Sequence, residues 1–446
     1  MGKIYKIPLG YRILRLYSNN FYGHWFSTIE VNGHENIPED ASVIFAPNHQ
    51  NAFTDAMALL STSPEPVIFL ARADLFKKSL LNKILRWLRI MPAYRMRDGI
   101  QNLKKNAESF DEAVRVLMHK EYFCLMPEGG QDEKRKLRPL VKGMFRIGFS
   151  AQSQYGETDT VWIVPTGIDY GNYDHSGSHL IMNFGKPISM KDYYAMYEEN
   201  APVAQNKIRD ELYSRMAPLM LNIRTDEYYD AIYTSAYICN LEQLNSQNWD
   251  DNETNRLIAR QQIVKSLDRA AANEANKKDF DELATLAKQW TELHSNIELT
   301  ARTMECGKQF DGAMLSSIIY AVVGLIPAAY SMALNWPVAA FIKWGNNKWG
   351  AEGFYSSVSL AASMVFFPIW HLILAIAGGI NVYNYFGLIT TVCFLVSLPM
   401  SVFFLLRYYW NTKYLYHRLK NTFGNDTLTE KIKEKVQQIT KLWHED

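Results

Sequence analysis

Hydrophobic and polar positions alternate in two different ways along this chain, and the pattern changes near residue 225. Before that point, short apolar runs are separated by stretches with helical spacing. The apolar runs cover 42–46, 67–70, 122–126 and 161–164, and the helical stretches include 79–88 and 100–118. Short runs alternating with helices are typical of buried strands in an α/β sheet. We therefore predict for residues 1–225 an α/β domain with a layered mixed sheet flanked by helices.

An amphipathic segment begins this domain. Residues 11–26 place apolar side chains such as Ile13 and Leu16 around Arg12 and Arg15 at about helical spacing. This pattern predicts a helix. A helix of this kind either lies in a membrane interface or packs on the domain that follows, and the sequence favours neither.

Two further segments are also predicted to be helical. Residues 226–308 are rich in Ala, Gln and Lys with almost no Gly or Pro, which predicts a linker of long helices. Residues 411–446 form the C-terminal part, where Ile432, Val436 and Ile439 recur on one face. That spacing predicts a C-terminal amphipathic helix.

A nearly charge-free region, 309–410, lies between them. No charged residue occurs in 312–342, and none in 353–406 apart from the titratable His371. Each stretch exceeds the roughly 20 apolar residues that cross a bilayer core. The sequence therefore predicts an integral membrane protein.

The second charge-free stretch divides near 378–381 into two predicted spans, 354–377 and 384–406. Lysines and arginines flank the pair on both sides, at Lys343 and Arg407 for example, whereas the connecting loop has none. By the positive-inside rule, both flanks and the first domain face the cytoplasm.

The first charge-free stretch, 313–342, also has cations at both of its ends. It contains Pro327 and the sequence Asn335–Trp336–Pro337, which would break one straight helix. We therefore expect a re-entrant or interfacial hairpin here.

Composition narrows the possible functions. The 47 Lys and Arg nearly cancel the 46 Asp and Glu, so a net charge of +1 argues against nucleic acid as a partner. The four cysteines are far apart, which predicts neither disulfides nor a structural zinc site and favours a reducing compartment. His175 and His179 are four residues apart, but Ser–Gly–Ser between them predicts a loop, so we expect no metal.

The first candidate for chemistry follows the apolar run 42–46. His49 comes just after the predicted strand, and Asp55 starts a helix. A histidine can remove a proton from a hydroxyl while a carboxylate orients its ring. No serine or cysteine nucleophile is evident nearby, which favours direct attack by a hydroxyl. Taken alone, this spacing of His49 and Asp55 favours a structural histidine at a strand end over a catalytic one.

Two more predicted strand ends carry glycine and polar residues. Glu128, Gly129 and Gly130 follow the run 122–126, and a cationic run from Lys134 to Lys142 comes next. Glycines allow a ligand close to the backbone, and cations suit a phosphate. The third strand end, 164–169, contains Pro165 and Gly167. We expect the three ends to share one crevice.

These residues resemble the PlsC-type glycerolipid acyltransferases. Asn48–His49 with Asp55 resembles the His–Asp motif of that family, Arg95 its second block, Pro127–Gly130 its third, and Val164–Pro165 its fourth. Order and spacing agree over about 40–190.

Two features depart from the family pattern. Five residues separate His49 from Asp55 instead of the usual four. A similar longer spacing occurs in a branch that acylates glycerol 3-phosphate or dihydroxyacetone phosphate and has C-terminal membrane segments. The usual Arg–Ser pair before the final strand is replaced by 175–179, which puts the cationic acceptor contact there in doubt.

The resemblance implies acyl transfer from acyl-CoA or an acyl-carrier protein to a hydroxyl of glycerol 3-phosphate or its monoacylated product. It implies His49 as the general base and Asp55 as its orienter. The acceptor would be bound by Arg95, or less readily Arg97, and by Glu128, Gly129, Gly130 and Lys142. It implies no bound cofactor or metal, and the bilayer as a partner.

Other interpretations stay open. The acceptor could be another lysophospholipid or an amino-acid lipid. The chain could also be an inactive, acyltransferase-like membrane scaffold.

Overall fold

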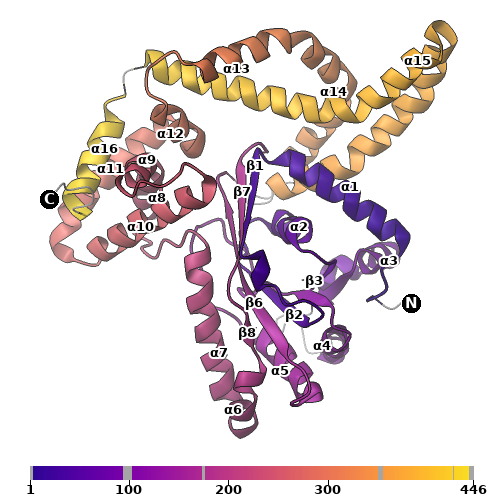
Figure 1. Ribbon diagram of the computed structural model, residues 1–446, viewed down its shortest axis with the longest axis vertical. Helices are drawn as coiled ribbons and strands as arrows, with labels where there is room; N and C mark the ends of the chain where they lie inside the picture. The colour runs from indigo at the N-terminus through magenta and orange to yellow at the C-terminus, as the bar shows by residue number, and fades with distance from the viewer. Residues whose placement is uncertain (1–3, 94–102, 173–175, 350–354, 425, 441–446) are drawn as a thin grey trace. The chain divides into compact units, whose positions relative to one another are not determined.

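The computed structural model describes residues 4–93, 103–172, 176–349, 355–424 and 426–440 (Figure 1). The chain forms two compact units. The first, here called the sheet unit, comprises 1–23, 29–170 and 180–221, and the second, the helical unit, comprises 24–28, 171–179 and 222–446. The predicted boundary at 225 lies close to the last junction.

The sheet unit is built on one mixed sheet. Its strands are β1 (Thr28–Asn32), β2 (Ser42–Pro47), β3 (Val67–Arg72), β4 (Ile90–Ala93), β5 (Tyr122–Cys124), β6 (Val161–Tyr170), β7 (His179–Phe184) and β8 (Ile188–Ser189). They run in the order β1-β7-β6-β2-β5-β3-β4, with β8 also on β6. The pairs from β6 through β2 to β4 are parallel, whereas β7 and β8 are antiparallel to β6. The predicted fold class is confirmed.

Helices connect these strands. They are α1 (Leu9–Trp25), α2 (Ala52–Thr62), α3 (Ser79–Trp87), α4 (Leu103–Met118), α5 (Gly143–Tyr155), α6 (Tyr194–Glu199) and α7 (Ala201–Met216). All four apolar runs form strands. Each is a continuous run of mostly apolar residues, which suits a strand that is buried on both faces of the sheet. The short or partly polar strands β1, β4, β7 and β8 had not been predicted, since tertiary pairing creates them.

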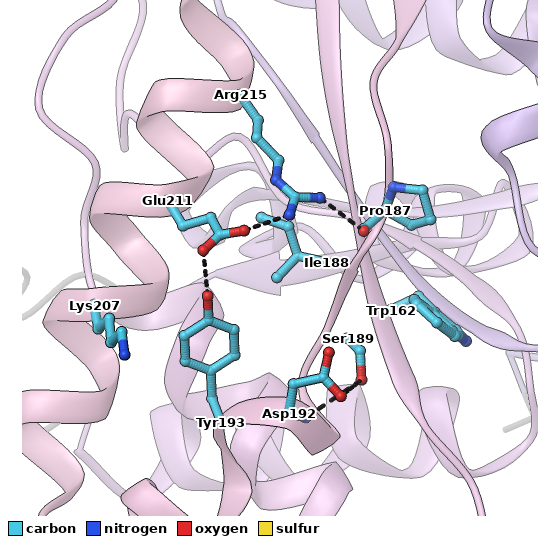
Figure 2. Close-up of a pocket in the computed structure, with 9 residues that line it drawn as sticks. All are labelled: Trp162, Pro187, Ile188, Ser189, Asp192, Tyr193, Lys207, Glu211 and Arg215. Carbon is cyan, nitrogen blue, oxygen red and sulfur yellow. Dashed lines mark hydrogen bonds and ion pairs between the residues drawn. The ribbon is translucent and has the colours of Figure 1, made fainter.

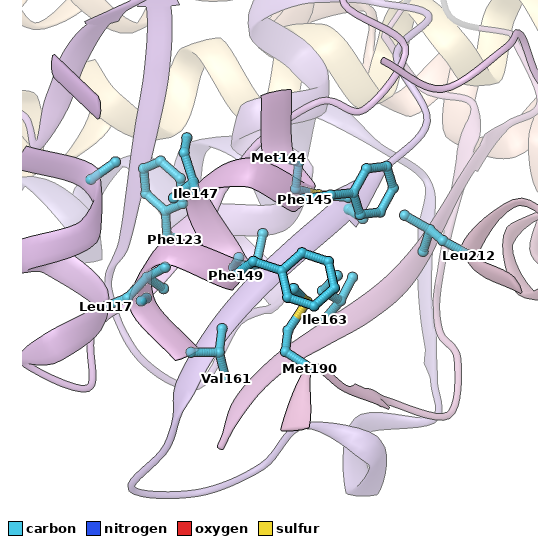
Figure 3. Packing of buried hydrophobic residues seen from close by; sticks show 14 of the residues in the cluster. Leu117, Phe123, Met144, Phe145, Ile147, Phe149, Val161, Ile163, Met190 and Leu212 are labelled. Atoms are coloured by element: carbon cyan, nitrogen blue, oxygen red, sulfur yellow. The ribbon is translucent and has the colours of Figure 1, made fainter. Parts of the chain in front are cut away.

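The core of the sheet unit lies between the sheet and helices α4, α5 and α7. Figure 3 shows Phe145 and Phe149 of α5 packed beside three aliphatic side chains, Leu117, Ile163 and Leu212. All five are fully buried. Each such side chain contributes about 1.5–3 kcal/mol by leaving water. This packing fixes the carboxyl ends of the parallel strands, where the candidate residues lie.

Strand β6 corrects one prediction. Pro165 and Gly167 lie inside the strand, which continues to Tyr170, so they are not part of a loop at its end. A Cβ on Gly167 would lie 2.2 Å from the carbonyl oxygen of Leu219. Glycine is therefore required by a close backbone approach and not by a ligand.

In the helical unit, residues predicted as a linker form a packed bundle. Its helices are α8 (Tyr229–Ile238), α9 (Asn240–Ser246), α10 (Glu253–Ala271), α11 (Lys277–Leu293) and α12 (Ile297–Glu305). Phe280, Leu283 and Trp290 are fully buried. The C-terminal helix α16 (Leu428–Thr440) buries Ile432 and Val436, so its apolar face packs within this unit.

The charge-free region forms three helical stretches, α13 (Gly312–Val323), α14 (Leu325–Trp349) and α15 (Tyr355–Phe423). Among the described residues, α14 and α15 are long and apolar enough to cross a membrane. The first charge-free stretch breaks at Gly324 and not at Asn335–Pro337. Asn335 is fully buried and donates to Ser401 Oγ at 2.7 Å, so it joins helices and does not end one.

Helix α15 is interrupted at Gly387, where φ is +79°, and not at the predicted 378–381. A Cβ on Gly378 would lie 3.0 Å from the Phe394 ring. Gly378 therefore lies inside the first arm of α15 and allows the arm after Gly387, which carries Phe394, to pack closely against it. Gly387 adopts a left-handed conformation that favours glycine.

Candidate active site

His49 and Asp55 lie together just beyond the carboxyl end of β2. The Nδ1 atom of His49 is 2.9 Å from Oδ2 of Asp55. The histidine side chain is 19% exposed, whereas the aspartate is completely buried. The ring is therefore open to a substrate on one side and held by a carboxylate on the other.

The start of α2 explains how Asp55 reaches back across five intervening residues. Ala52, at the first position of the helix, has a φ of +36°, which turns the chain sharply. Oδ2 of Asp55 then accepts the backbone N–H groups of Gln50 at 2.9 Å and Asn51 at 2.8 Å. The extra residue is accommodated by this turn, and the His–Asp contact is kept.

Asn48 fixes the other side of the same loop. Its side chain donates to the carbonyl of Ile168 at 3.0 Å and accepts the Ile168 N–H at 2.7 Å. Both contacts are buried. This pair of hydrogen bonds joins the β2 loop to strand β6, so the position of His49 is tied to two adjacent strands.

Glu128 supports His49 directly, a contact that the sequence did not predict. Its Oε1 accepts the backbone N–H of His49 at 2.8 Å, and its Oε2 accepts Nε of Arg138 at 2.9 Å. Burial raises the pKa of Glu128, while these hydrogen bonds and the Arg138 charge oppose the rise. Gly129 adopts a φ of +69°, and the Gly130 carbonyl accepts from Arg138.

The cationic run is partly used inside the protein. Arg135 is 1% exposed and pairs with buried Asp169 at 3.1 Å, and Arg138 pairs with Glu128. These two cations are therefore not the phosphate contacts that the run suggested. Lys142 is exposed at the start of α5. Arg95 and Arg97 lie outside the described residues.

This arrangement suits proton transfer at the exposed side of the histidine ring. Because Nδ1 faces Asp55, Nε2 is the nitrogen that can accept a proton from a ligand. Within the described part of the chain, the His49 ring makes no hydrogen bond to a serine or cysteine. The geometry agrees with direct attack by a bound hydroxyl.

A separate hollow of about 270 Å³ lies near the other end of β6 (Figure 2). Trp162, Ser189, Tyr193 and Arg215 are among the residues that line it. Trp162 is in register with Val43 of β2, six residues before His49. At about 3.3 Å per residue this separates the hollow from His49 by roughly 20 Å, so it is not part of the His–Asp site.

Sequence comparison now identifies the domain. The family described as Acyltransferase matches residues 28–169, which include His49, Asp55, Glu128 and Arg138. This part of the chain, about a third of its length, is therefore similar to acyltransferase domains, and the His–Asp pair lies inside the matched region.

Other comparisons add little to this result. No relative was found among curated proteins. Solved structures similar to the chain include the 1-acyl-sn-glycerophosphate (LPA) acyltransferase PlsC from Thermotoga maritima. It is 19% identical, with a TM-score of 0.34, and the match covers 46% of this chain and 80% of that one. A TM-score this low supports no comparison of residues.

The roles of three residues in the sheet unit were missed from the sequence. Arg138 was recognised only as one member of the cationic run, and Asn48 only as the residue before His49 in the motif. Tyr170 lies one residue beyond the predicted strand end, 164–169. Tyr170 donates its hydroxyl to Oδ1 of Asp55 at 2.8 Å. The contacts of Asn48 and Tyr170 have no local sequence signal, because they join segments far apart in the chain. Arg138 contacts Glu128 within the loop between β5 and α5, where the sequence does not show which cation folds back.

The pair formed by Glu128 and Arg138 yields a pH-dependent prediction. The pKa of Glu128 is raised in the folded protein. The folded protein therefore loses stability as the pH rises from the ordinary pKa of a glutamate through this raised pKa and the carboxyl group becomes charged. Arg138→Ala removes an opposing charge and raises this pKa further. We expect the thermal unfolding midpoint of Arg138→Ala to be lowered much more at pH 8 than at pH 5.

The control is Arg209→Ala, which removes an arginine paired on the surface with its neighbour Asp210. Its midpoint should stay within about 1 °C of wild type at both pH values, because surface pairs contribute little. An equal loss at pH 5 and pH 8 for Arg138→Ala would contradict the electrostatic account.

Proposed function

We propose that the chain is a membrane-bound O-acyltransferase of phospholipid synthesis. It transfers a fatty acyl group from a thioester donor to a hydroxyl of glycerol 3-phosphate or 1-acylglycerol 3-phosphate. The observation that carries the proposal is the His49–Asp55 pair, 2.9 Å apart at the open edge of an acyltransferase domain. The resemblance of the flanking sequence blocks to glycerolipid enzymes supports the acceptor class.

The reaction follows from the geometry of the pair. Nε2 of His49 takes the proton of the acceptor hydroxyl as its oxygen attacks the thioester carbonyl. The carbon–sulfur bond then breaks, an ester forms, and the imidazolium returns the proton to the leaving thiolate. Asp55 holds the ring and stabilises its positive charge. The step consumes no oxidant or reductant, and we propose no cofactor or metal.

The acceptor phosphate would be bound by cations near this edge. Arg95, with Arg97 as a substitute, and Lys142 remain our candidates. Gly129 and Gly130 shape the loop beside them. Glu128 is given a different role from the one first predicted: both of its oxygens accept protein donors, so it supports the His49 backbone.

The donor is acyl-CoA or an acyl-carrier protein, both of which present a thioester. A related acceptor, such as another lysophospholipid or an amino-acid lipid, would use the same His–Asp chemistry. An inactive scaffold is the least supported alternative, because a buried carboxylate aligned on an open histidine has a cost in stability that a scaffold would not need.

Membrane attachment would keep a lipid acceptor close to the enzyme. Helices α14 and α15 have the length and composition of spans. Helix α1 has one side that packs on the protein and one that does not: Tyr11 and Phe21 are buried, whereas Leu9, Ile13 and Leu16 are at least 59% exposed. We propose that this exposed side lies in the membrane interface, with the acyltransferase domain at the cytoplasmic face.

His49→Ala tests the proposed chemistry. General-base assistance contributes about 10² to 10⁴ in rate, so the variant should retain under about 1% of wild-type acyl transfer. Labelled acyl-CoA and acyl-carrier protein would be offered with glycerol 3-phosphate, 1-acylglycerol 3-phosphate and other lysophospholipids in turn, using purified full-length protein.

His34→Ala is the matched control, because His34 is exposed on the same unit and lies away from the pair. It should keep wild-type activity. If His49→Ala retained more than a tenth of that activity, the general-base assignment would be wrong. If the enzyme acylated only an acceptor that is not a glycerol phosphate, the proposed acceptor would be wrong.

The membrane topology is tested by two cysteines in a variant that lacks exposed Cys306 and Cys393. Tyr385 is beside the Gly387 break, and Tyr416 follows Arg407; they are 80% and 64% exposed. In intact cells, an impermeant maleimide should label Tyr385→Cys but not Tyr416→Cys. Labelling of Tyr416→Cys from outside would contradict the two-span arrangement.

A further inference from the structure

A tyrosine completes the environment of Asp55. Tyr170 is the last residue of β6 and is fully buried, and its hydroxyl donates to Oδ1 of Asp55 at 2.8 Å. The other oxygen, Oδ2, contacts His49, Gln50 and Asn51. Tyr170 is therefore the contact that holds the far side of the carboxylate, opposite the histidine.

A second buried tyrosine adjoins the first. Tyr22 of α1 is fully buried, and its hydroxyl lies 3.1 Å from the carbonyl oxygen of Thr54. Its hydroxyl also interacts with that of Tyr170. Because Tyr22 donates its proton to Thr54, the proton of Tyr170 remains directed at Asp55.

Both hydroxyls stay protonated across the working pH range. Burial raises the pKa of Tyr170 well above 10, and the nearby Asp55 carboxylate raises it further. Burial has the same effect on the pKa of Tyr22. Tyr170 is therefore a permanent hydrogen-bond donor to Asp55, not an acid or base in its own right.

We propose that Tyr170 is a positioning residue for acyl transfer, acting on His49 through Asp55. The inference rests on the proposed function and assigns a new residue to the same site. The Tyr170 hydroxyl fixes the rotation of the carboxylate and disperses its charge. Both effects set how firmly Asp55 holds the histidine ring and how strongly it favours the protonated ring.

Packing alone does not account for the hydroxyl. The aromatic ring could fill the end of β6 equally well as phenylalanine, without placing a polar group in a buried site. A buried hydroxyl is accommodated only when it has a partner, and here that partner is the carboxylate that contacts His49. The hydroxyl, not the ring, therefore carries the inferred role.

The direction of the pH effect follows from the charge on Asp55. Without the Tyr170 donor, that charge is less dispersed, so the protonated form of the His49–Asp55 pair becomes more favourable. More of the enzyme then carries the proton that blocks the base. Removal of the hydroxyl should therefore move the acidic limb of the pH–rate profile to higher pH.

Other titratable or charged groups surround the pair and must stay unchanged in the test. They are Tyr22 on α1, Cys124 at the end of β5, Glu128 and Arg138 below the His49 backbone, Asp132 beside the His49 carbonyl, and the Arg135–Asp169 ion pair at β6. Tyr170→Phe alters none of these side chains, so a shift in the profile reports on the lost hydroxyl.

The experiment compares Tyr170→Phe with wild type in full-length protein, using the best acceptor from the substrate panel. We expect kcat to fall about tenfold, in line with the loss of one hydrogen bond to a charged group. KM for donor and acceptor should stay within about twofold. The acidic limb of the kcat profile should move up by roughly 0.5–1 pH unit.

Tyr122→Phe is the matched control. Tyr122 also donates a hydrogen bond, to the Pro38 carbonyl at 3.0 Å, but it lies at the opposite end of the sheet, in register with Val43. Its removal costs stability in a similar way without reaching Asp55. The pH profile of Tyr122→Phe should match wild type.

A double-mutant cycle separates action through Asp55 from a general structural effect. In an Asp55→Asn background, Tyr170→Phe should change the residual rate by less than about twofold, because residues that act through one contact are not additive. A full tenfold further loss would overturn the proposal. So would a Tyr170→Phe profile whose acidic limb coincides with wild type.

These outcomes are distinct from failure of the proposed function. If the wild type transfers no acyl group, or His49→Ala is as active as wild type, the proposed function fails. If the wild type is active and His49→Ala is not, but Tyr170→Phe behaves like Tyr122→Phe, only the role of Tyr170 is overturned.

Discussion

The sheet edge that carries the candidate site is organised around one buried carboxylate. Asp55 has no exposure to solvent, and a charged group in such a place is tolerated only with several hydrogen bonds. Its partners come from the loop after β2 and from the end of β6. Satisfying this carboxylate therefore constrains the helix start, the loop and the strand end at the same time, and His49 is the partner left partly open.

Glu128 adds a second constraint of the same kind. It bonds the backbone of His49, whereas Asp55 bonds the ring, so main chain and side chain are each held by a carboxylate. Arg138 neutralises Glu128 beneath the loop. The histidine is thus fixed in place before a substrate arrives, which is the condition for efficient proton transfer.

How much of this could be predicted from the sequence differs between its parts. The four central strands could be predicted, because a continuous apolar run marks a buried strand within a few neighbouring residues of the sequence. The His49–Asp55 pair was predictable because one turn of chain joins the two residues. Tyr170 and Asn48 could not be assigned their contacts, since each depends on which strands are neighbours. Arg138 could not be assigned its contact either, because the path of the loop that joins it to Glu128 has no pattern in the sequence. The breaks at Gly324 and Gly387 were missed because Asn335 and Gly378 are residue types that commonly mark turns. In this protein they lie where helices pack together, so they mark no turn.

The central claim is that Asp55 makes His49 an effective base, and it is tested most directly by the rate of acyl transfer in Asp55→Asn. The asparagine keeps the shape of the side chain but removes its charge. The account predicts a fall of about 10² to 10⁴ in kcat, with substrate KM values little changed. An Asp55→Asn enzyme within about twofold of the wild-type rate would contradict it.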